Sequence, residues 1–565
     1  MTAGALYQIQ NSKNSENNFL EYNPQISFFK VVYRRHTLFS IDNIIINDLS
    51  RTSVDYSNAV IIKCDIPRNG DLLKNLYLTF ELPNVYSGKS SNNPENFYEF
   101  RWIENIGINI FKSVKFKFND KSIETLYSDY INIWKELTMD DTEKKFFNKC
   151  IGNIKELTDP KNGLGQNGVY PHSIKSNDNT LLSTANNKET IYNNNNTSGV
   201  ISSIADVDIE STFPSIIGRK IKVPLPFFFT KNHGMALPLI ALQYTTCSLE
   251  LEMRSFKDLY TILETDINKT YIGKRVKPTE AYHHIQHFTK APFSNGDNVF
   301  IKPNIEGEYI FLETDERNKF AINSHEYLIE QSKNLDIDGI PIISNVETTT
   351  YRMDIFNPVK YITWVVKRND MSKINIWNNY SNWISEISPY SKQYINSRYY
   401  IGGEKTYNNT PNNYTIDYFN EQYYNISNNR TVFYTYNDEN HKTKYNTTYF
   451  KKNILTNFKL ELDGQIRIDK DIDYFGKQQI YQHFKKNTKD GIYVYSFSLN
   501  PNDFQPSGSC NFSNIQNAKI FLKKNILESF GDHEPVGHDF KCYIYTVNYN
   551  ILVIKSGMAD LKFVN

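Results

Sequence analysis

The stretch Val114-Lys-Phe-Lys-Phe-Asn-Asp-Lys-Ser-Ile-Glu124 alternates apolar and polar residues, breaks at Asn119-Asp120 and then resumes as a second short run. Alternation of this kind is typical of a β-strand with one buried face, and the break is typical of a tight turn. The stretch therefore predicts a β-hairpin.

A second stretch, Phe458-Lys-Leu-Glu-Leu-Asp-Gly-Gln-Ile-Arg-Ile468, repeats this pattern. Its break at Asp463-Gly464 is typical of a two-residue turn of type I′. Both stretches are followed at the same offset by an Asp-Tyr pair, Asp129-Tyr130 and Asp473-Tyr474. The match favours one β-rich unit used twice. The alternative is that any two amphipathic hairpins look alike.

Length and composition agree with a duplicated β protein. A chain of 565 residues is too long for one hydrophobic core and fits two large domains. Aromatic residues make up 14% of the chain, and this enrichment favours strands over helices.

Charge, hydropathy and cysteine content exclude several classes of protein. The 63 basic residues balance 62 acidic ones, so the chain lacks the excess positive charge that attracts nucleic acid. No apolar run is long enough to span a bilayer and the N-terminus lacks a signal peptide, so we expect a soluble, unsecreted protein. The cysteines occur singly, which argues for reduced thiols in a reducing cytoplasm. They are Cys64, Cys150, Cys247, Cys510 and Cys542.

Short aromatic and β-branched runs between turn residues predict most of the strands. These runs are residues 26–33, 59–66, 76–82, 114–118, 248–253, 308–312, 359–366, 492–499, 518–522 and 543–554. We expect helices at 128–137, where apolar residues follow helical spacing, and at 324–331.

Two polar stretches, 161–203 and 370–450, have too little aliphatic content to build a core, and we expect them to form long surface loops. The resulting division has four parts. They are an N-terminal segment 1–24, a first domain 25–256, a connector 257–300 and a second domain 301–565.

Motifs for catalysis are missing from the sequence. We find no phosphate-binding loop, nucleophile elbow or dinucleotide-binding glycine motif, and His325-Glu326 begins like a zinc-protease motif but has Ile329 where the second His would stand. We therefore expect no enzyme, no catalytic residue, no cofactor and no metal.

Two clusters nevertheless carry side chains that bind metals elsewhere. They are His283, His284 and His287, and then Asp532, His533, Glu534, His538 and Asp539. Neither has the ligand spacing of a structural zinc site, so solvated loop histidines are the simpler interpretation.

Two further surface motifs have simple interpretations. Arg34-Arg35-His36 follows a predicted strand and fits a solvated strand end or a subunit contact better than a phosphate contact. Sequons for N-glycosylation fit coincidence in a chain so rich in Asn. They are at Asn195, Asn408, Asn413, Asn425, Asn429 and Asn446.

Longer motifs, in this order, resemble the major capsid proteins of nucleocytoplasmic large DNA viruses, the type found in giant amoebal and algal viruses. The N-terminal half carries Asn23-Pro-Gln-Ile-Ser-Phe-Phe-Lys-Val-Val-Tyr-Arg-Arg-His-Thr37, Arg68-Asn-Gly-Asp-Leu72 and Leu237-Pro-Leu-Ile-Ala-Leu-Gln-Tyr244. The C-terminal half carries Tyr309 to Arg317, Phe356-Asn-Pro-Val-Lys360, Tyr493 to Leu499, Gln505 to Ser513, Asn548 to Leu552 and Ser556-Gly-Met558. The resemblance runs from about residue 20 to the C-terminus and weakens in the two polar stretches.

The resemblance implies an all-β chain with two consecutive eight-stranded antiparallel jelly rolls, long surface loops and a few short helices. A double jelly roll accounts for the repeated hairpin. It also implies a homotrimer of pseudo-hexagonal outline that tiles the icosahedral shell of a large double-stranded DNA virus.

The partners and location that the resemblance implies follow from that role. Neighbouring capsomers, minor capsid proteins and penton proteins are the expected partners, with no direct nucleic-acid contact. The N-terminal segment would lie at the capsomer base towards an underlying viral membrane, and the outer loops would contact fibres or a host receptor. The protein is expected in the virion capsid after assembly in the host cytoplasm.

Two alternatives remain open. One is a minor capsid paralogue or an assembly scaffold of the same fold. The other is a carbohydrate-binding β-sandwich, since jelly rolls also host lectins and hydrolases and a fold does not decide a function.

Overall fold

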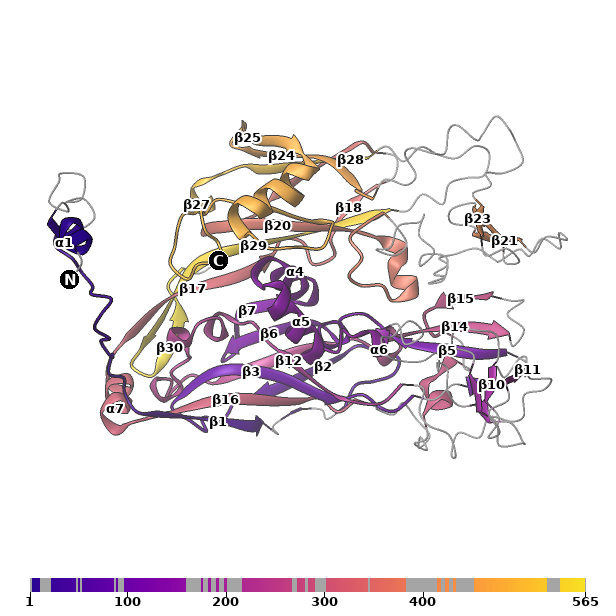
Figure 1. Cartoon of the computed structure of the whole chain (residues 1–565), viewed down its shortest axis with the longest axis horizontal. Helices are drawn as coiled ribbons and strands as arrows, with labels where there is room; N and C mark the ends of the chain where they lie inside the picture. The colour runs from indigo at the N-terminus through magenta and orange to yellow at the C-terminus, as the bar shows by residue number, and fades with distance from the viewer. Residues whose placement is uncertain are drawn as a thin grey trace.

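The structure is a computed structural model of the whole chain (Figure 1). It describes residues 3–10, 22–46, 49–50, 53–85, 88–89, 96–158, 174–175, 181–183, 190–192, 198–200, 216–266, 272–279, 283–289, 301–343, 346–382, 414–417, 422–425, 430–432, 452–525 and 539–563.

The N-terminal half of the chain forms two four-stranded antiparallel sheets. One sheet has the order β1 (Phe39–Ile46), β16 (Asn304–Leu312), β3 (Leu72–Glu81) and β12 (Lys220–Pro224). The other has the order β2 (Val60–Asp65), β13 (Cys247–Met253), β6 (Phe111–Phe118) and β7 (Lys121–Tyr127).

The C-terminal half repeats this arrangement (Figure 1). Its first sheet has the order β17 (His325–Asn334), β29 (Phe540–Lys555), β20 (Pro358–Arg368) and β26 (Ile492–Ser496), with three short strands added. Its second has the order β19 (Thr348–Met353), β28 (Ala518–Lys524), β24 (Leu455–Leu462) and β25 (Gln465–Asp471).

The two halves share one strand order. When the eight strands of each half are numbered along the chain, one sheet reads 1-8-3-6 and the other reads 2-7-4-5 in both halves. Two such sheets packed face to face make a jelly roll. The predicted fold class, two consecutive eight-stranded jelly rolls, is confirmed.

The repeated hairpin is equivalent at the level of individual bonds. The ladder of β6 with β7 is interrupted after Phe116, and that of β24 with β25 after Leu460, which is the third position of both quoted stretches. Asn119 and Asp463 both have positive φ, as does Gly464, in agreement with the predicted type I′ turn.

These two turn residues are held in the same way. The backbone N–H of Asn119 donates to Thr246 O, and its side-chain Oδ1 accepts from Thr246 N at 2.9 Å. Asp463 makes the same pair of bonds with Asn517, the Oδ1 bond at 2.8 Å. Each turn is thus fixed to the residue that precedes the neighbouring strand, β13 or β28.

The remaining elements are short and decorate the two jelly rolls. The helices are α1 (Ala3–Gln10), α3 (Ile106–Asn109), α4 (Ser128–Thr138), α5 (Asp141–Cys150), α6 (Lys155–Thr158), α7 (Thr314–Ile322), the 3-10 turns η3 (Phe228–Thr230), η4 (His233–Met235), η5 (Leu239–Ala241), η6 (Phe256–Asp258), η8 (Ile285–Phe288), η9 (Asn369–Ile374) and η12 (Phe512–Asn514), and the π-helical η10 (Tyr474–Gln478) and η11 (Ile480–Phe484). The extra strands are β4 (Gly88–Lys89), β5 (Asn96–Trp102), β8 (Ile174–Lys175), β9 (Leu181–Ser183), β10 (Thr190–Tyr192), β11 (Ser198–Val200), β14 (Tyr260–Asp266), β15 (Ile272–Val276), β18 (Ile340–Ile342), β21 (Tyr414–Asp417), β22 (Gln422–Asn425), β23 (Arg430–Val432), β27 (Cys510–Asn511) and β30 (Met558–Leu561). The predicted helix at 128–137 is confirmed as α4.

Three sequence-based expectations differ from the structure. Residues 26–33 were expected to form a strand but form none, because nothing in the described chain pairs with them. Residues 324–331 were expected to form a helix, but they lie in β17, where pairing with β29 outweighs helix propensity. Residues 308–312 were assigned to the second domain, but they lie in β16 between β1 and β3 of the first jelly roll.

Residues 257–300, expected to be a connector, contribute β14 and β15 to a sheet with β5 and β4. Most of 161–203 and 370–450 lies outside the described residues, so the loop predictions there stay predictions. Apart from the placement of β16 in the first jelly roll, the domain boundaries also stay predictions.

We expect Asn119→Ala and Asp463→Ala each to lower the free energy of unfolding by about 1 to 2 kcal/mol. Each change removes a hydrogen bond and puts Ala at a positive φ. Chemical denaturation measures the loss. Asp120→Ala is the control, because Asp120 is exposed in the same turn without a positive φ. A loss at Asp120 as large as at Asn119 would contradict the assigned role of the turn residues.

Candidate functional site

In the sheet β17-β29-β20-β26, strands β20 and β26 and the middle of β29 are buried on both faces. Along β20, Ile362, Trp364 and Val366 enter the core of the second jelly roll. Tyr361 and Val365 point the other way and belong to the core that fills the first jelly roll. A strand buried on both faces accounts for the near-continuous apolar run that predicted it. The two jelly rolls therefore share a wall.

Helix α4 of the first jelly roll packs against this shared sheet, between the two lobes in Figure 1. The ring of Tyr130 lies 5.8 Å from that of Tyr545 on β29, and Tyr127 lies 6.2 Å from the same ring. Aromatic pairs at these separations add to the stability that area burial supplies.

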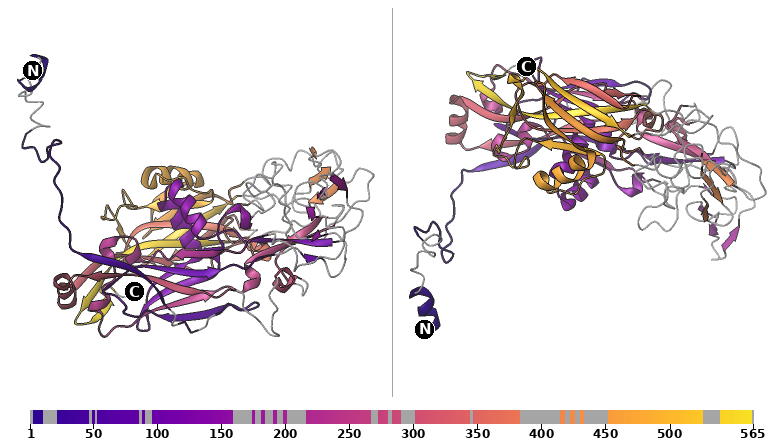
Figure 2. Two further views of the ribbon diagram at one scale, coloured as in Figure 1. Left: turned by 60° about the horizontal axis from the view of Figure 1, so that its bottom comes forward. Right: turned by 90° about the horizontal axis from the view of Figure 1, so that it is seen from above.

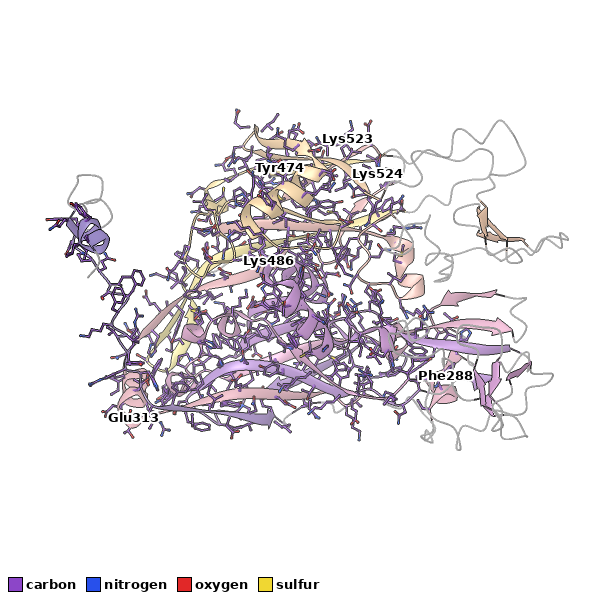
Figure 3. The ribbon with its side chains drawn as sticks, in the orientation of Figure 1. Phe288, Glu313, Tyr474, Lys486, Lys523 and Lys524 are labelled. Atoms are coloured by element: carbon purple, nitrogen blue, oxygen red, sulfur yellow. The ribbon has the colours of Figure 1, made fainter. Side chains whose placement is uncertain are left out.

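Hydrogen bonds and ion pairs also cross the junction. Gln331 Nε2 donates to Ile123 O, and Ser332 Oγ donates to Thr125 O, so β17 is fixed to β7. Asn375 Nδ2 donates to Tyr260 O at 2.9 Å. Lys367 pairs with Asp129, and Lys486, labelled in the seam between the lobes in Figure 3, pairs with Asp140. Polar bonds over an apolar contact fix one relative orientation of the lobes.

Glu124 is a buried carboxyl at this junction. Its Oε2 accepts a hydrogen bond from Phe228 N at 2.9 Å. Burial raises the pKa of Glu124 to about 7, and the positive charge of Lys231 acts in the opposite direction. Burial thus favours the neutral carboxyl at pH values below about 7.

The N-terminal arm, residues 22–38, is the most exposed part of the described chain. It leaves the body beside α7 and projects away from it to α1 (Figures 1 and 2). Phe28 is 87% exposed, Tyr33 is 86% exposed and Phe29 is fully exposed. Such a run of exposed apolar side chains is typical of a segment that binds another molecule.

The end of the body next to the arm is also apolar. We call this surface the base. Elements α7 and β30 and the start of β17 lie there (Figure 1). Its exposed apolar residues are Tyr244, Ile322, Leu328, Met558 and Phe563. Tyr244 N donates to Gly557 O, which ties the first jelly roll to the C-terminal hairpin at this surface.

The arm and the base both carry charged side chains. The arm carries Lys30, Arg34, Arg35 and His36. Helix α7 begins with the acidic residues Glu313, Asp315 and Glu316 and continues with the basic residues Arg317 and Lys319, and Asp560 on β30 pairs with Lys121. Figure 3 labels Glu313 at this end. Sequence reasoning placed Arg34-Arg35-His36 at a strand end or a subunit contact; the structure puts them on the exposed arm, without a strand.

The other residues considered from the sequence do not converge on a site. No group of three His, Cys, Asp or Glu able to hold a metal occurs in the described ranges. His283 is buried, which lowers its pKa to about 4, and His284 lies 3.8 Å from the ring of Tyr56. The side chain of His287 and residues 532–538 lie outside the description, as do the sequons except the backbone of Asn425. The expected absence of catalytic, cofactor and metal sites stays a prediction.

No helix among the described residues has the length and apolar content needed to cross a membrane.

Glu124→Gln is expected to change the pH dependence of stability. Because the pKa of Glu124 is raised, its carboxyl stabilises the fold below the unfolded value of 4.5, and this contribution is lost as pH rises towards 7. We compare the free energy of unfolding of the variant with that of wild type by urea unfolding. The difference, variant minus wild type, should be about 2 kcal/mol more positive at pH 8 than at pH 5. Glu250→Gln is the control. It should lower the free energy of unfolding by a similar amount at both pH values, because hydrogen bonds from Lys117 and Lys115 hold the pKa of Glu250 at about 2. An unchanged pH profile in Glu124→Gln would refute the assignment.

Comparisons with known proteins cover almost the whole chain. The family model described as "Major capsid protein N-terminus" matches residues 27–286, and the model "Large eukaryotic DNA virus major capsid protein" matches residues 316–560. The chain is similar to the major capsid protein of Phaeocystis pouchetii virus, at 28% identity over all of both chains. It is also similar to "Capsid protein 1" of Acanthamoeba polyphaga mimivirus, at 26% identity over all of both chains.

Solved structures agree on the fold. A PBCV-1 capsid structure matches with a TM-score of 0.57 at 23% identity, covering 95% of this chain and 100% of that one. The Faustovirus major capsid protein matches with a TM-score of 0.54 at 12% identity, covering 98% and 96%. Because these relatives are structural proteins, the expectation that the chain is not an enzyme is confirmed. Two family models that follow one another along the two jelly rolls, and relatives aligned from end to end, lead to one conclusion: the chain belongs to the major capsid protein family of large eukaryotic DNA viruses.

Proposed function

We propose that this major capsid protein assembles into trimers of pseudo-hexagonal outline, which tile the icosahedral shell of a large double-stranded DNA virus. The observation that carries the proposal is the pair of jelly rolls with one strand order, joined through a shared sheet into a single block. Three such blocks present six similar lobes around one axis. A closed threefold ring uses one repeated contact, as closed symmetric oligomers do.

The arm supplies that contact. Residues 22–38 can span roughly 55 Å when extended, which is enough to cross to an adjacent subunit. Its apolar side chains would cover the apolar base of the neighbour, while Lys30, Arg34 and Arg35 would face the acidic residues of α7. A contact of one copy's arm with the next copy's base is head-to-tail, and such contacts form a closed trimer when successive copies are related by a threefold rotation. A permanent interface of this kind is expected to bury more than about 2,000 Å².

The opposite end of the molecule is proposed as the outer crown. The small sheets β11-β10-β9-β8 and β21-β22-β23 belong to the two polar stretches, and both lie at the end far from the arm (Figure 1). With the arm at the inner base, this end would face outward and meet fibres or a host receptor. Minor capsid and penton proteins and an underlying membrane are the proposed partners at the base, and assembly is proposed in the host cytoplasm.

A minor capsid paralogue is the second candidate. One virus, Acanthamoeba polyphaga mimivirus, has both a "Capsid protein 1" and a "Probable capsid protein 4" among the relatives of this chain. Abundance separates the candidates, because a major shell protein dominates the protein of purified virions whereas a paralogue is scarce.

Light scattering of the purified protein should give three times the 66.1 kDa mass of the chain. The double change Phe28→Ser and Phe29→Ser should weaken assembly by at least about 3 kcal/mol, or roughly a hundredfold in dissociation constant, because two large apolar side chains no longer become buried. Circular dichroism should show that this variant stays folded.

Ile466→Ser is the matched control, since Ile466 is an exposed apolar residue on β25, away from the arm. It should leave the trimer intact. A wild-type chain that stays monomeric while folded would contradict assembly through the arm, and so would a trimer that survives the double change.

A further inference from the structure

A cavity of about 460 Å³ lies between the two jelly rolls, where η9 and residues at the ends of β13, β20 and β29 meet the start of α4. It is separate from the arm and the base. The charged side chains that line it are Lys112, Asp129, Arg254, Asp338, Lys367, Arg368 and Lys541. Lys112 pairs with Glu252, which lies outside the lining, and the other four cations still outnumber the two carboxylates in a chain that is nearly neutral overall.

The strand register creates part of this surplus. Lys367 on β20 lies directly opposite Lys541 on β29. Like charges at directly opposite positions destabilise a sheet. Lys367 pairs with Asp129, but no carboxylate in the described part of the chain forms an ion pair with Lys541. One lysine of the pair is thus left without a balancing charge.

Arg254 adds a second cation with unused hydrogen-bonding capacity. Its guanidinium lies 4.1 Å from the ring centre of Trp377, and one terminal nitrogen donates to Ser128 Oγ at 3.2 Å. Its Nε is buried without a hydrogen-bond partner. Burial also lowers the pKa of Arg254 and of Lys367, so both positive charges are held at an electrostatic cost.

The N-terminus of α4 opens onto the same cavity. Ser128 and Asp129, in its first turn, line the wall, and Tyr127 at the N-cap provides no side-chain hydrogen bond to the helix. The first N–H groups of a helix carry partial positive charge and bind anions. Cations on strands of both jelly rolls and a helix terminus therefore line one cavity, which is partly open to solvent.

We infer that this cavity is a binding site for a phosphate group, either inorganic phosphate or the phosphate of a monoester. A phosphate dianion would balance the charge of Lys541, which Asp129 does not, and would accept a hydrogen bond from Arg254. The volume falls in the range of small-molecule sites, so a group attached to the phosphate also fits. Because the walls come from both lobes, the bound anion would fasten the junction.

The test is thermal unfolding of the full chain at constant ionic strength, with potassium phosphate replacing potassium chloride. The midpoint should rise and then saturate at millimolar phosphate, as expected for a ligand that binds only the folded state. Broadening of the phosphate signal in ³¹P NMR gives a direct measure of binding. An unsaturated rise, without broadening, would overturn the proposal, because phosphate also stabilises proteins through exclusion from their surface.

Variants locate the site. Lys541→Gln should lower phosphate affinity at least tenfold, whereas Lys470→Gln, at an exposed lysine on β25 that does not line the cavity, should not change it. Lys541→Glu is the more decisive variant, because it places a carboxylate opposite Lys367. It should raise the midpoint of thermal unfolding without phosphate and remove the response to phosphate. Equal phosphate responses in wild type and in both Lys541 variants would overturn the proposal.

The source of the phosphate group is resolved by repeating the titration with adenosine monophosphate. Binding at least tenfold tighter than that of inorganic phosphate, and competitive with it, identifies a nucleotide-type monoester. Equal or weaker binding identifies free phosphate. If neither compound produces a saturable shift that Lys541→Gln weakens, the site is not a phosphate site. All of these readings are independent of trimer formation.

Discussion

The central strands of the sheet β17-β29-β20-β26 are closed to water on both faces, and the arrangement of the two lobes follows from this burial. One face fills the second jelly roll, while the other closes a core that continues into the first. Separating the lobes would expose Tyr361, Val365 and Tyr545 together with the polar groups that cross the junction. Because burial of apolar area is the dominant favourable term in folding, the two jelly rolls hold together as one block.

Polar groups within this junction set its geometry more than its strength. Gln331 and Ser332 donate to carbonyls of β7, and these bonds form only when the two lobes meet in one register. Buried charges add little net stability, since desolvation offsets their attraction. The register of β20 with β29 also explains why Lys367 and Lys541 lie opposite each other. The same register lines up the apolar side chains of these two strands.

The double jelly roll and the N-terminal arm have different roles in an assembly. The double jelly roll presents two similar lobes at fixed positions, which suits a tile that must meet many neighbours in similar ways. The arm, in contrast, exposes Phe28, Phe29 and Tyr33 without contacting its own body. An apolar segment of this kind gains its stability only in an assembly, so folding of the block and association of blocks are separate steps.

Elements that follow a local rule were predictable from the order of the amino acids. Alternation over residues 114–118 and the Asp463-Gly464 turn are short-range patterns, so hairpin, turn type and duplication could be read directly, and the family motifs then implied the double jelly roll. Local rules failed where pairing over long distances decided the outcome. Residues 324–331 became a strand because β29 lay beside them, residues 308–312 joined the first jelly roll, and residues 26–33 found no partner. The shared sheet, the surroundings of the buried Glu124 and the cationic cavity each combine segments far apart in the chain, so their residues meet only in the folded protein.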